Sequence, residues 1–126
     1  MIRGTGVDSV EIERIAQSLK RFGSRFKDRF FTANEQNYCD FKANSAQHYA
    51  ARFAAKEAFA KALGRGIADG IRWVDVEVTR RKSGRPDLKL RGRARKLLKR
   101  HGKTRIWLSL THTASTATAF VVIESR

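Results

Sequence analysis

Two acidic residues far apart in the chain, Asp8 and Glu57, lie where carboxylates can do metal chemistry. Asp8 directly follows the segment Gly-Thr-Gly-Val, and Glu57 lies among Arg52, Lys56 and Lys61 in a run that is otherwise mostly alanine and phenylalanine. Magnesium sites that hold polyphosphates use one or two carboxylates, several waters and the phosphate oxygens themselves. The two acids therefore predict a site for Mg²⁺ and a polyphosphate.

Each acid also has a simpler structural interpretation. Asp8 can cap the N-terminus of a helix that follows it. Glu57 can form a surface ion pair with Lys61, four residues further along, which would contribute only ~0.3–0.5 kcal/mol. Spacing alone leaves both interpretations open.

The cations around Glu57 favour an anionic ligand. Arg52 and Lys56 are four residues apart, so they share one face of a helix and repel each other. An anion lying across both would remove that repulsion. The segment Gly64-Arg65-Gly66 follows, and it either ends the helix or lets the backbone approach a phosphate closely.

The elements that must position these residues follow from periodicity and from glycine. A helix is expected to begin after Ser9, which could act as its N-cap, and to end at Gly23. Further helices are expected in a short stretch around residues 26–31 and in the segments 32–41, 46–63 and 91–101, with Thr32 and Glu35 as a capping box at the start of the segment 32–41. Strands are expected at residues 1–8, 73–80, 88–90, 106–111 and 118–124. The mixed order, with a hairpin in the middle, favours an α+β fold over a doubly wound one: an antiparallel sheet packed with one long and several shorter helices.

Length and composition limit the class of protein. The chain has 126 residues, which predicts one domain spanning residues 1–126. Its single cysteine, Cys39, excludes an intrachain disulfide and a cysteine-rich zinc site. No apolar run reaches the ~18 residues of a membrane span, and the first residues lack the apolar core of a signal peptide, so a cytoplasmic location is expected. The net charge of +15 predicts an anionic partner.

Three motifs together resemble the 4′-phosphopantetheinyl transferase superfamily. Its Gly-x-Asp motif is present as Gly6-Val7-Asp8, and its long-helix motif as Phe53-Ala54-Ala55-Lys56-Glu57-Ala58-Phe59-Ala60-Lys61. The length, the Arg52 before the helix motif and the segment Ser109-Leu110-Thr111-His112-Thr113 are similar to the short, single-repeat branch, the holo-acyl-carrier-protein synthases. Longer members carry a further acid where this chain has Val10, which also favours the short branch.

The resemblance implies a reaction and a role for each motif residue. Members move 4′-phosphopantetheine from coenzyme A to a serine of an apo acyl carrier protein. Asp8 and Glu57 would hold Mg²⁺ against the coenzyme A pyrophosphate, and Glu57 would accept the serine proton directly or through a metal-bound water. Lys61 would neutralise charge on the leaving 3′,5′-ADP or the transferred phosphate. The further candidates for coenzyme A contacts are Arg52, Lys56 and Gly64.

The resemblance also implies an oligomer. The short branch forms homotrimers with active sites at subunit interfaces, where His112 and Thr113 line the coenzyme A site from a neighbouring subunit. From the residues alone, a single histidine beside a strand is as consistent with a structural role. His48 and His101 lie in no motif and are expected at the surface.

The first helix offers a basic strip for the second substrate. Its cations are Arg14, Lys20, Arg21 and Arg25. A solvated basic face is one interpretation. A docking strip for an acidic carrier protein is the other, because charge complementarity speeds and orients association, and the family uses this helix for carrier recognition.

The resemblance does not explain a second basic segment. Its cations are Arg80, Arg81, Lys82, Arg91, Arg93, Arg95, Lys96, Lys99, Arg100, Lys103 and Arg105. Nucleic-acid binding is the rival function, because such segments bind phosphates without sequence preference. The aromatic residues, however, follow helical core spacing and do not alternate with the cations as stacking platforms would. A relative that binds coenzyme A without turnover is the third alternative, and intact Asp8, Glu57 and Lys61 argue against it.

Overall fold

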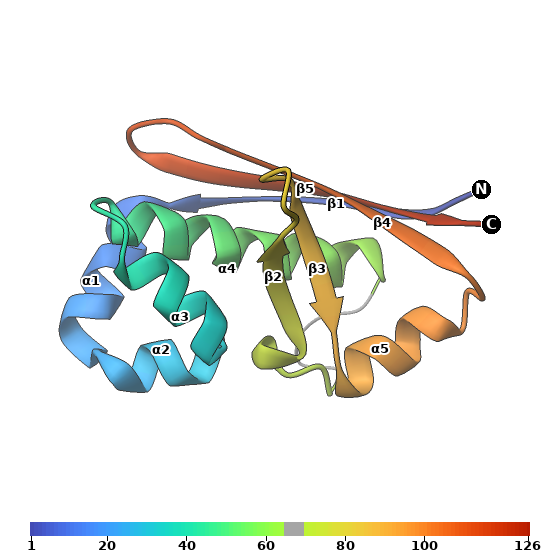
Figure 1. Ribbon diagram of the computed structural model, residues 1–126, viewed down its shortest axis with the longest axis horizontal. Coiled ribbons are helices and arrows are strands. Elements are labelled where there is room, and N and C mark those ends of the chain that lie inside the picture. The colour runs from blue at the N-terminus through green and yellow to red at the C-terminus, as the bar shows by residue number, and fades with distance from the viewer. Residues whose placement is uncertain (65–69) are drawn as a thin grey trace.

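The architecture is an antiparallel sheet covered on one face by a long helix (Figure 1). It is seen in a computed structural model that describes residues 1–64 and 70–126. The strands are β1 (Ile2–Glu11), β2 (Val76–Arg80), β3 (Pro86–Leu90), β4 (Thr104–His112) and β5 (Thr116–Ser125). The helices are α1 (Ile12–Phe22), α2 (Ser24–Phe30), α3 (Ala33–Asp40), α4 (Ser45–Ala62) and α5 (Gly92–Lys99). The predicted α+β class with an antiparallel sheet is confirmed.

The strands form two separate antiparallel sheets. The first has the order β1-β5-β4, and the second is the hairpin β2-β3. Helix α4 runs along one face of the three-stranded sheet, and α1, α2 and α3 gather around its N-terminal half (Figure 1). The main core lies between α4, the sheet and α5, with Ala58, Phe59, Val121 and Leu97 among its buried residues. Within the described ranges, no helix combines the length and apolarity that crossing a bilayer requires.

Strand β1 approaches α4 so closely that backbone meets backbone. A Cβ atom built on Gly4 would lie 1.8 Å from the carbonyl oxygen of Ala62, and one on Gly6 would lie 1.9 Å from that of Ala58. Any side chain at either position would therefore force the strand off the helix. Since side chains alternate along a strand, Asp8 projects from the same face as these glycines, toward α4.

The start of α3 carries the predicted capping box. The backbone N–H of Glu35 donates to Thr32 Oγ1 at 3.2 Å, and the backbone N–H of Thr32 donates to Glu35 Oε1 at 2.9 Å. The same carboxylate accepts hydrogen bonds from Lys56 Nζ at 2.8 Å and from the backbone N–H of Val78 at 2.9 Å. One side chain thus joins α3, α4 and β2.

Several boundaries differ from those predicted. Strand β1 does not end at residue 8 but continues to Glu11, so Asp8 lies inside the strand and caps no helix. Ser9 is not a cap either, because its hydroxyl pairs with that of Thr118 at 2.8 Å. The predicted strand at 73–80 begins with a short 3-10 turn, Trp73–Asp75. The predicted stops at Gly23 and Gly64 are confirmed by φ values of 56° and 73°, whereas residues 65 and 66 lie outside the described ranges.

Candidate active site

Asp8 and Glu57, which we call the acid pair, line one cavity of about 470 Å³, the acid-pair cavity. Its walls come from β1, α1, α2 and α4, and Arg14 and Phe53 also line it. Asp8 reaches it because β1 turns this side chain toward α4, where two glycines allow close packing. The structure thus brings together the two acids that the sequence separates by 49 positions.

Lys61 completes this group. Its Nζ atom lies 3.0 Å from Asp8 Oδ1 and donates to the carbonyl oxygen of Val7 at 3.1 Å. The Lys61 side chain is 55% exposed and that of Asp8 only 13%, so the ammonium group covers the carboxylate from the solvent side. Lys61 follows Glu57 by one helical turn, and both therefore face β1.

Glu57 is in an electrostatically unfavourable position. Burial is the main cause that raises its pKa, the negative charge of Asp8 raises it further, and Lys61 acts in the opposite direction. A divalent cation between the two carboxylates would relieve both effects, and two carboxylate ligands match the preference of Mg²⁺. Since the described residues contain no cluster of three or more metal-binding side chains, waters and substrate oxygens would supply the remaining ligands. A carboxylate with a raised pKa is also a better proton acceptor near neutral pH.

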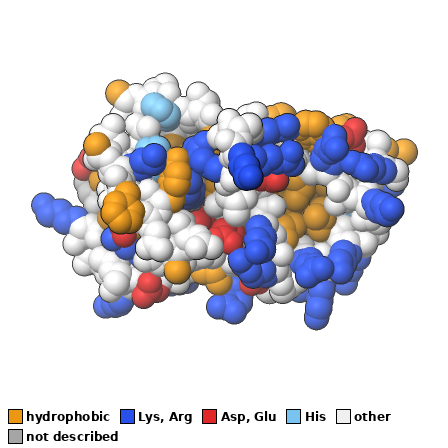
Figure 2. Space-filling view, viewed as in Figure 1, with side chains coloured by type: hydrophobic (Ala, Val, Ile, Leu, Met, Phe, Trp, Pro, Cys, Tyr) orange, Lys and Arg blue, Asp and Glu red, His pale blue; other side chains and the backbone are white. Residues whose placement is uncertain are grey.

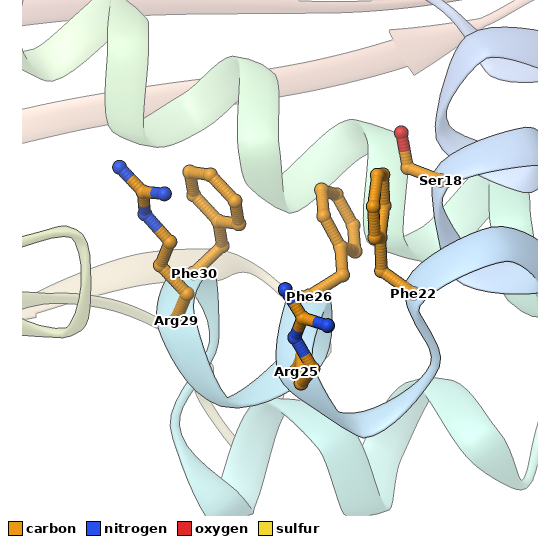
Figure 3. A pocket seen from close by; sticks show the side chains of 6 residues that line it. All are labelled: Ser18, Phe22, Arg25, Phe26, Arg29 and Phe30. Atoms are coloured by element: carbon orange, nitrogen blue, oxygen red, sulfur yellow. The ribbon is translucent and has the colours of Figure 1, made fainter.

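A second cavity of about 390 Å³ adjoins the first. Figure 3 shows its lining, in which Phe22, Phe26 and Phe30 form an aromatic wall and Arg25 and Arg29 project beside them. The two cavities share Ser18, Phe26 and Phe30. The arrangement is a mixed apolar and basic surface that leads directly to the acid pair.

The predicted basic strip is divided by these cavities. Lys20, Arg21 and Arg25 are exposed, and Arg25 lines the aromatic cavity. Arg14 instead lines the cavity that holds Asp8. Substituting Arg14 would therefore disturb both sites, so it is not a clean probe of carrier binding.

A group of cations surrounds the ring of Tyr38. The guanidinium carbons of Arg52 and Arg80 lie 4.1 and 5.3 Å from the ring centroid, and Lys42 Nζ lies 4.7 Å from it. The His48 ring meets Tyr38 edge-on, with 5.7 Å between centroids. We call these five residues the Tyr38 cluster.

The electrostatics of the Tyr38 cluster favour an anion. Burial is the main cause that lowers the pKa of His48, and the charges of Arg52, Lys42, Arg80 and His112 lower it further. Arg52 is 1% exposed, and its buried Nε has no hydrogen-bond partner among the described residues. A phosphate would satisfy that donor and offset the repulsion. Of these five residues, the sequence indicated only Arg52 as a candidate for a coenzyme A contact. Lys42, His48 and Arg80 form no motif with it, so their convergence on Tyr38 could not be predicted from the sequence.

Lys56 requires a correction. Its side chain is fully buried, and Nζ donates to Glu35 Oε1 at 2.8 Å and to the carbonyl oxygens of Val76 and Trp73 at 2.6 and 3.0 Å. All three ammonium donors are used, so none remains for a phosphate. The sequence pattern was misleading because Lys56 shares a helix face with Arg52, and that face packs against α3 and β2.

His112 and Thr113 lie apart from the acid pair. His112 pairs with Ala117 of β5, which in turn pairs with Val10 of β1, so the histidine is at the opposite edge of the sheet from β1. Both residues are exposed, and Thr113 Oγ1 accepts backbone hydrogen bonds of the β4–β5 turn. The charge of His112 acts on His48, which associates it with the Tyr38 cluster.

Comparison with known proteins identifies the family of this chain. Residues 4–121 match the family described as the 4′-phosphopantetheinyl transferase superfamily. The chain is 52% identical to a holo-[acyl-carrier-protein] synthase of Geobacter sp. (strain M21) and 48% identical to one of Koribacter versatilis, in each case over 98% of this chain and 99% of the relative.

Solved structures give the same result. The crystal structure of the synthase from Neisseria meningitidis is 36% identical with a TM-score of 0.89, over 99% of this chain and 100% of that one. The synthase from Bacillus anthracis in complex with coenzyme A (3′,5′-ADP) is 34% identical with a TM-score of 0.82, over 100% and 99%. The chain therefore belongs to the holo-acyl-carrier-protein synthases of the 4′-phosphopantetheinyl transferase superfamily.

Proposed function

We propose that this enzyme, in the cytoplasm, transfers 4′-phosphopantetheine from coenzyme A to a serine of an apo acyl carrier protein in a Mg²⁺-dependent reaction. The products are the holo carrier protein and 3′,5′-ADP. The observation that carries the proposal is the convergence of Asp8 and Glu57 on one cavity, with the pKa of Glu57 raised by burial and by Asp8.

The chain's residues have separate tasks in this reaction. The serine Oγ attacks the phosphorus that bears the pantetheine arm, a P–O bond to serine forms, and the pyrophosphate P–O bond breaks. Glu57 accepts the serine proton, directly or through water. Lys61 moves from Asp8 to the leaving phosphate, whose charge it offsets. Mg²⁺, held by Asp8 and Glu57, would stabilise negative charge on the phosphoryl oxygens.

Mass spectrometry of an apo carrier protein tests this proposal. Incubation with the enzyme, coenzyme A and Mg²⁺ should add one phosphopantetheine arm to the carrier protein and release 3′,5′-ADP. A chelator should prevent the mass gain, and excess Mg²⁺ should restore it. Transfer at an undiminished rate in the chelator would exclude the metal from the reaction.

The Tyr38 cluster is the proposed site for further phosphate of coenzyme A. Of the residues that the sequence suggests for coenzyme A contacts, Arg52 belongs to this cluster, and its buried Nε has no hydrogen-bond partner among the described residues. Gly64 is exposed, no described residue lies within 4 Å of its Cβ position, and it remains a candidate for close approach of backbone to phosphate. Lys56 is not included, because its donors are used inside the protein.

The positions of these groups support a shared active site. Arg52 and Glu57 are five residues apart on α4, which is a rotation of about 140°, so they point to different sides of the helix. One coenzyme A molecule contacts both groups most simply if they come from two copies of the chain. The sheet face opposite α4 is uncovered (Figure 1), and the paired residues Val7 and Phe120 are 54% and 45% exposed there. We propose that this face packs in a homotrimer.

Mixed trimers test the shared site. Glu57→Gln and His112→Ala should each be inactive or strongly impaired alone. After co-refolding, sites that combine an intact Glu57 from one chain with an intact His112 from another should regain activity, about a quarter of wild type for random assortment. Light scattering should report three copies in each sample. Mixtures no more active than the separate variants would place the whole site within one chain.

The ionisation of His48 reports occupancy of the Tyr38 cluster. Burial and, to a smaller extent, the surrounding cations hold the pKa of His48 below its usual value, so the negative charge of a bound phosphate should raise it. NMR titration of the His48 ring with and without 3′,5′-ADP measures the change, and the ring of His101 serves as the internal control. An unchanged His48 pKa in the saturated complex would place the phosphate elsewhere.

Carrier binding should depend on the exposed part of the basic strip. Replacing Lys20, Arg21 and Arg25 with glutamate should raise the KM for an acidic carrier protein by about 10- to 100-fold, because the enzyme surface would then repel the acidic carrier protein instead of attracting it. The KM for coenzyme A should stay nearly constant. Steady-state kinetics with each substrate varied separately gives both values, and equal increases would refute separate binding surfaces.

A further inference from the structure

The end of the molecule that carries α5 is strongly basic. Figure 2 shows Lys and Arg side chains gathered there, away from α1 and α2. Residues 80–105 contain 13 of the 27 Lys and Arg residues but only one acid, Asp87. Asp87 is already paired with Arg81 at 3.1 Å. We define the basic end by its exposed cations Arg95, Lys96, Lys99, Arg100, Lys103, Arg105 and Arg126.

Packing holds these cations outward. Ala94 and Leu97 on the inner face of α5 are buried in the main core, and Leu98 packs against it. This packing fixes the orientation of α5, so the cations on its outer face point to solvent. Among the described residues, no carboxylate lies within ion-pair distance of a side chain of the basic end. Within residues 1–64 and 70–126, these cations therefore have no carboxylate partner, and only Arg105 packs on an aromatic ring, that of Trp107.

The basic end also lies outside the proposed catalytic machinery. Neither the acid-pair cavity nor the Tyr38 cluster includes a residue of α5. Figure 1 places α5 at the opposite end of the molecule from α1, which carries most of the basic strip proposed to bind the carrier protein. Neither coenzyme A nor the carrier protein therefore accounts for this charge.

Exposed apolar side chains adjoin the basic end. The side chains of Met1 and Ile2 are 76% and 58% exposed. The Met1 amino group donates to the carbonyl oxygen of Ser125 at 2.9 Å, and the backbone N–H of Arg126 donates to that of Lys103 at 3.0 Å. Strand β1, strand β5 and the turn after α5 thus meet, with apolar and cationic groups side by side.

This combination distinguishes between anionic partners. A bilayer surface attracts cations through its headgroups and accepts apolar side chains at its interface. Nucleic acid offers phosphates but no apolar phase for Met1 and Ile2, and single strands also use exposed aromatic platforms on which their bases stack. Trp107 cannot supply one, because it is partly buried, donates to Glu124 at 3.1 Å and is covered by Arg85 and Arg105.

We propose that the basic end is a reversible docking surface for an anionic lipid bilayer. The attachment is peripheral and electrostatic. The acid pair and the basic strip remain accessible at the other end of the molecule. Salt weakens the attachment because it screens charge.

Vesicle co-sedimentation tests the proposal. The protein should bind vesicles of mixed phosphatidylglycerol and phosphatidylcholine at physiological salt, but not phosphatidylcholine alone. The variant Arg95→Gln/Lys96→Gln/Lys99→Gln should bind the mixed vesicles about 100-fold more weakly while phosphopantetheine transfer in solution stays unchanged. The matched control Lys20→Gln/Arg21→Gln/Arg25→Gln removes the same charge from the other end and should bind vesicles like wild type.

Three results would overturn this inference. They are equal loss of vesicle binding in both variants, absence of binding to the mixed vesicles, and tighter binding to duplex DNA than to vesicles at the same salt. Circular dichroism melts of both variants exclude unfolding as the cause of any loss. Because transfer is measured separately, failure of the docking surface and failure of the proposed reaction are distinguishable.

Discussion

Replacing Glu57 with glutamine is expected to lower kcat for phosphopantetheine transfer by about 10²- to 10⁴-fold, because the change removes the proposed proton acceptor and one of the two proposed metal ligands. The amide is nearly the same size as the carboxylate, so the cavity keeps its shape. Steady-state kinetics at saturating substrates measures the loss. Glu13→Gln, an exposed acid on α1, is the matched control and should be close to wild type.

The same variant should gain stability in the absence of metal. Folding raises the pKa of Glu57, so its ionised form is disfavoured in the native state. The wild type therefore loses stability as pH rises through the raised pKa, whereas the glutamine variant does not. Urea unfolding in chelator should show the variant's advantage at neutral pH and little difference below about pH 4. A glutamine variant that is both active and no more stable would remove Glu57 from the metal site.

Replacing Lys56 with alanine is expected to lower the free energy of unfolding by about 3–5 kcal/mol, because Glu35 would remain charged, buried and unpaired. The carbonyl oxygens of Val76 and Trp73 would also lose their donor. Denaturant titration measures the change. Lys61→Ala is the matched control: its ion pair is more than half exposed on the lysine side, so the cost should stay within about 1 kcal/mol.

A double-mutant cycle separates the ion pair from its surroundings. Lys56→Met with Glu35→Gln removes both charges and should be more stable than Lys56→Met alone. Recovery will be incomplete, because a glutamine has only one acceptor oxygen for the backbone N–H groups of Thr32 and Val78. If the double variant were as unstable as the sum of the single ones, the two side chains would not act as a pair.

The sequence predicted most elements that position the site because their signals are local. The capping box at Thr32 and Glu35 depends on residues three apart, and the stop at Gly23 depends on one backbone conformation. The acid pair was also predictable, but only through the motif resemblance. Neither periodicity nor charge brings Asp8 next to Glu57; the close packing of β1 on α4 does.

The contacts made by the three cations of α4 were the least predictable part of the site. Arg52, Lys56 and Lys61 belong to the same helix and look alike in sequence, yet one covers a tyrosine ring, one is buried in an ion pair and one reaches Asp8. What separates them is the identity of the neighbouring element, α3, β2 or β1. Those neighbours come from segments up to about 50 positions away, so the information is tertiary.

The contact of two glycines with α4 has a consequence for redesign. With no side chain between Gly6 and the Ala58 carbonyl, the gap between strand and helix is set by main-chain atoms alone. That gap fixes how far one carboxylate stands from the other, independently of what fills the rest of the interior. Repacking elsewhere can therefore be extensive without changing the separation of the two carboxylates, whereas one added methyl group at this contact would change it.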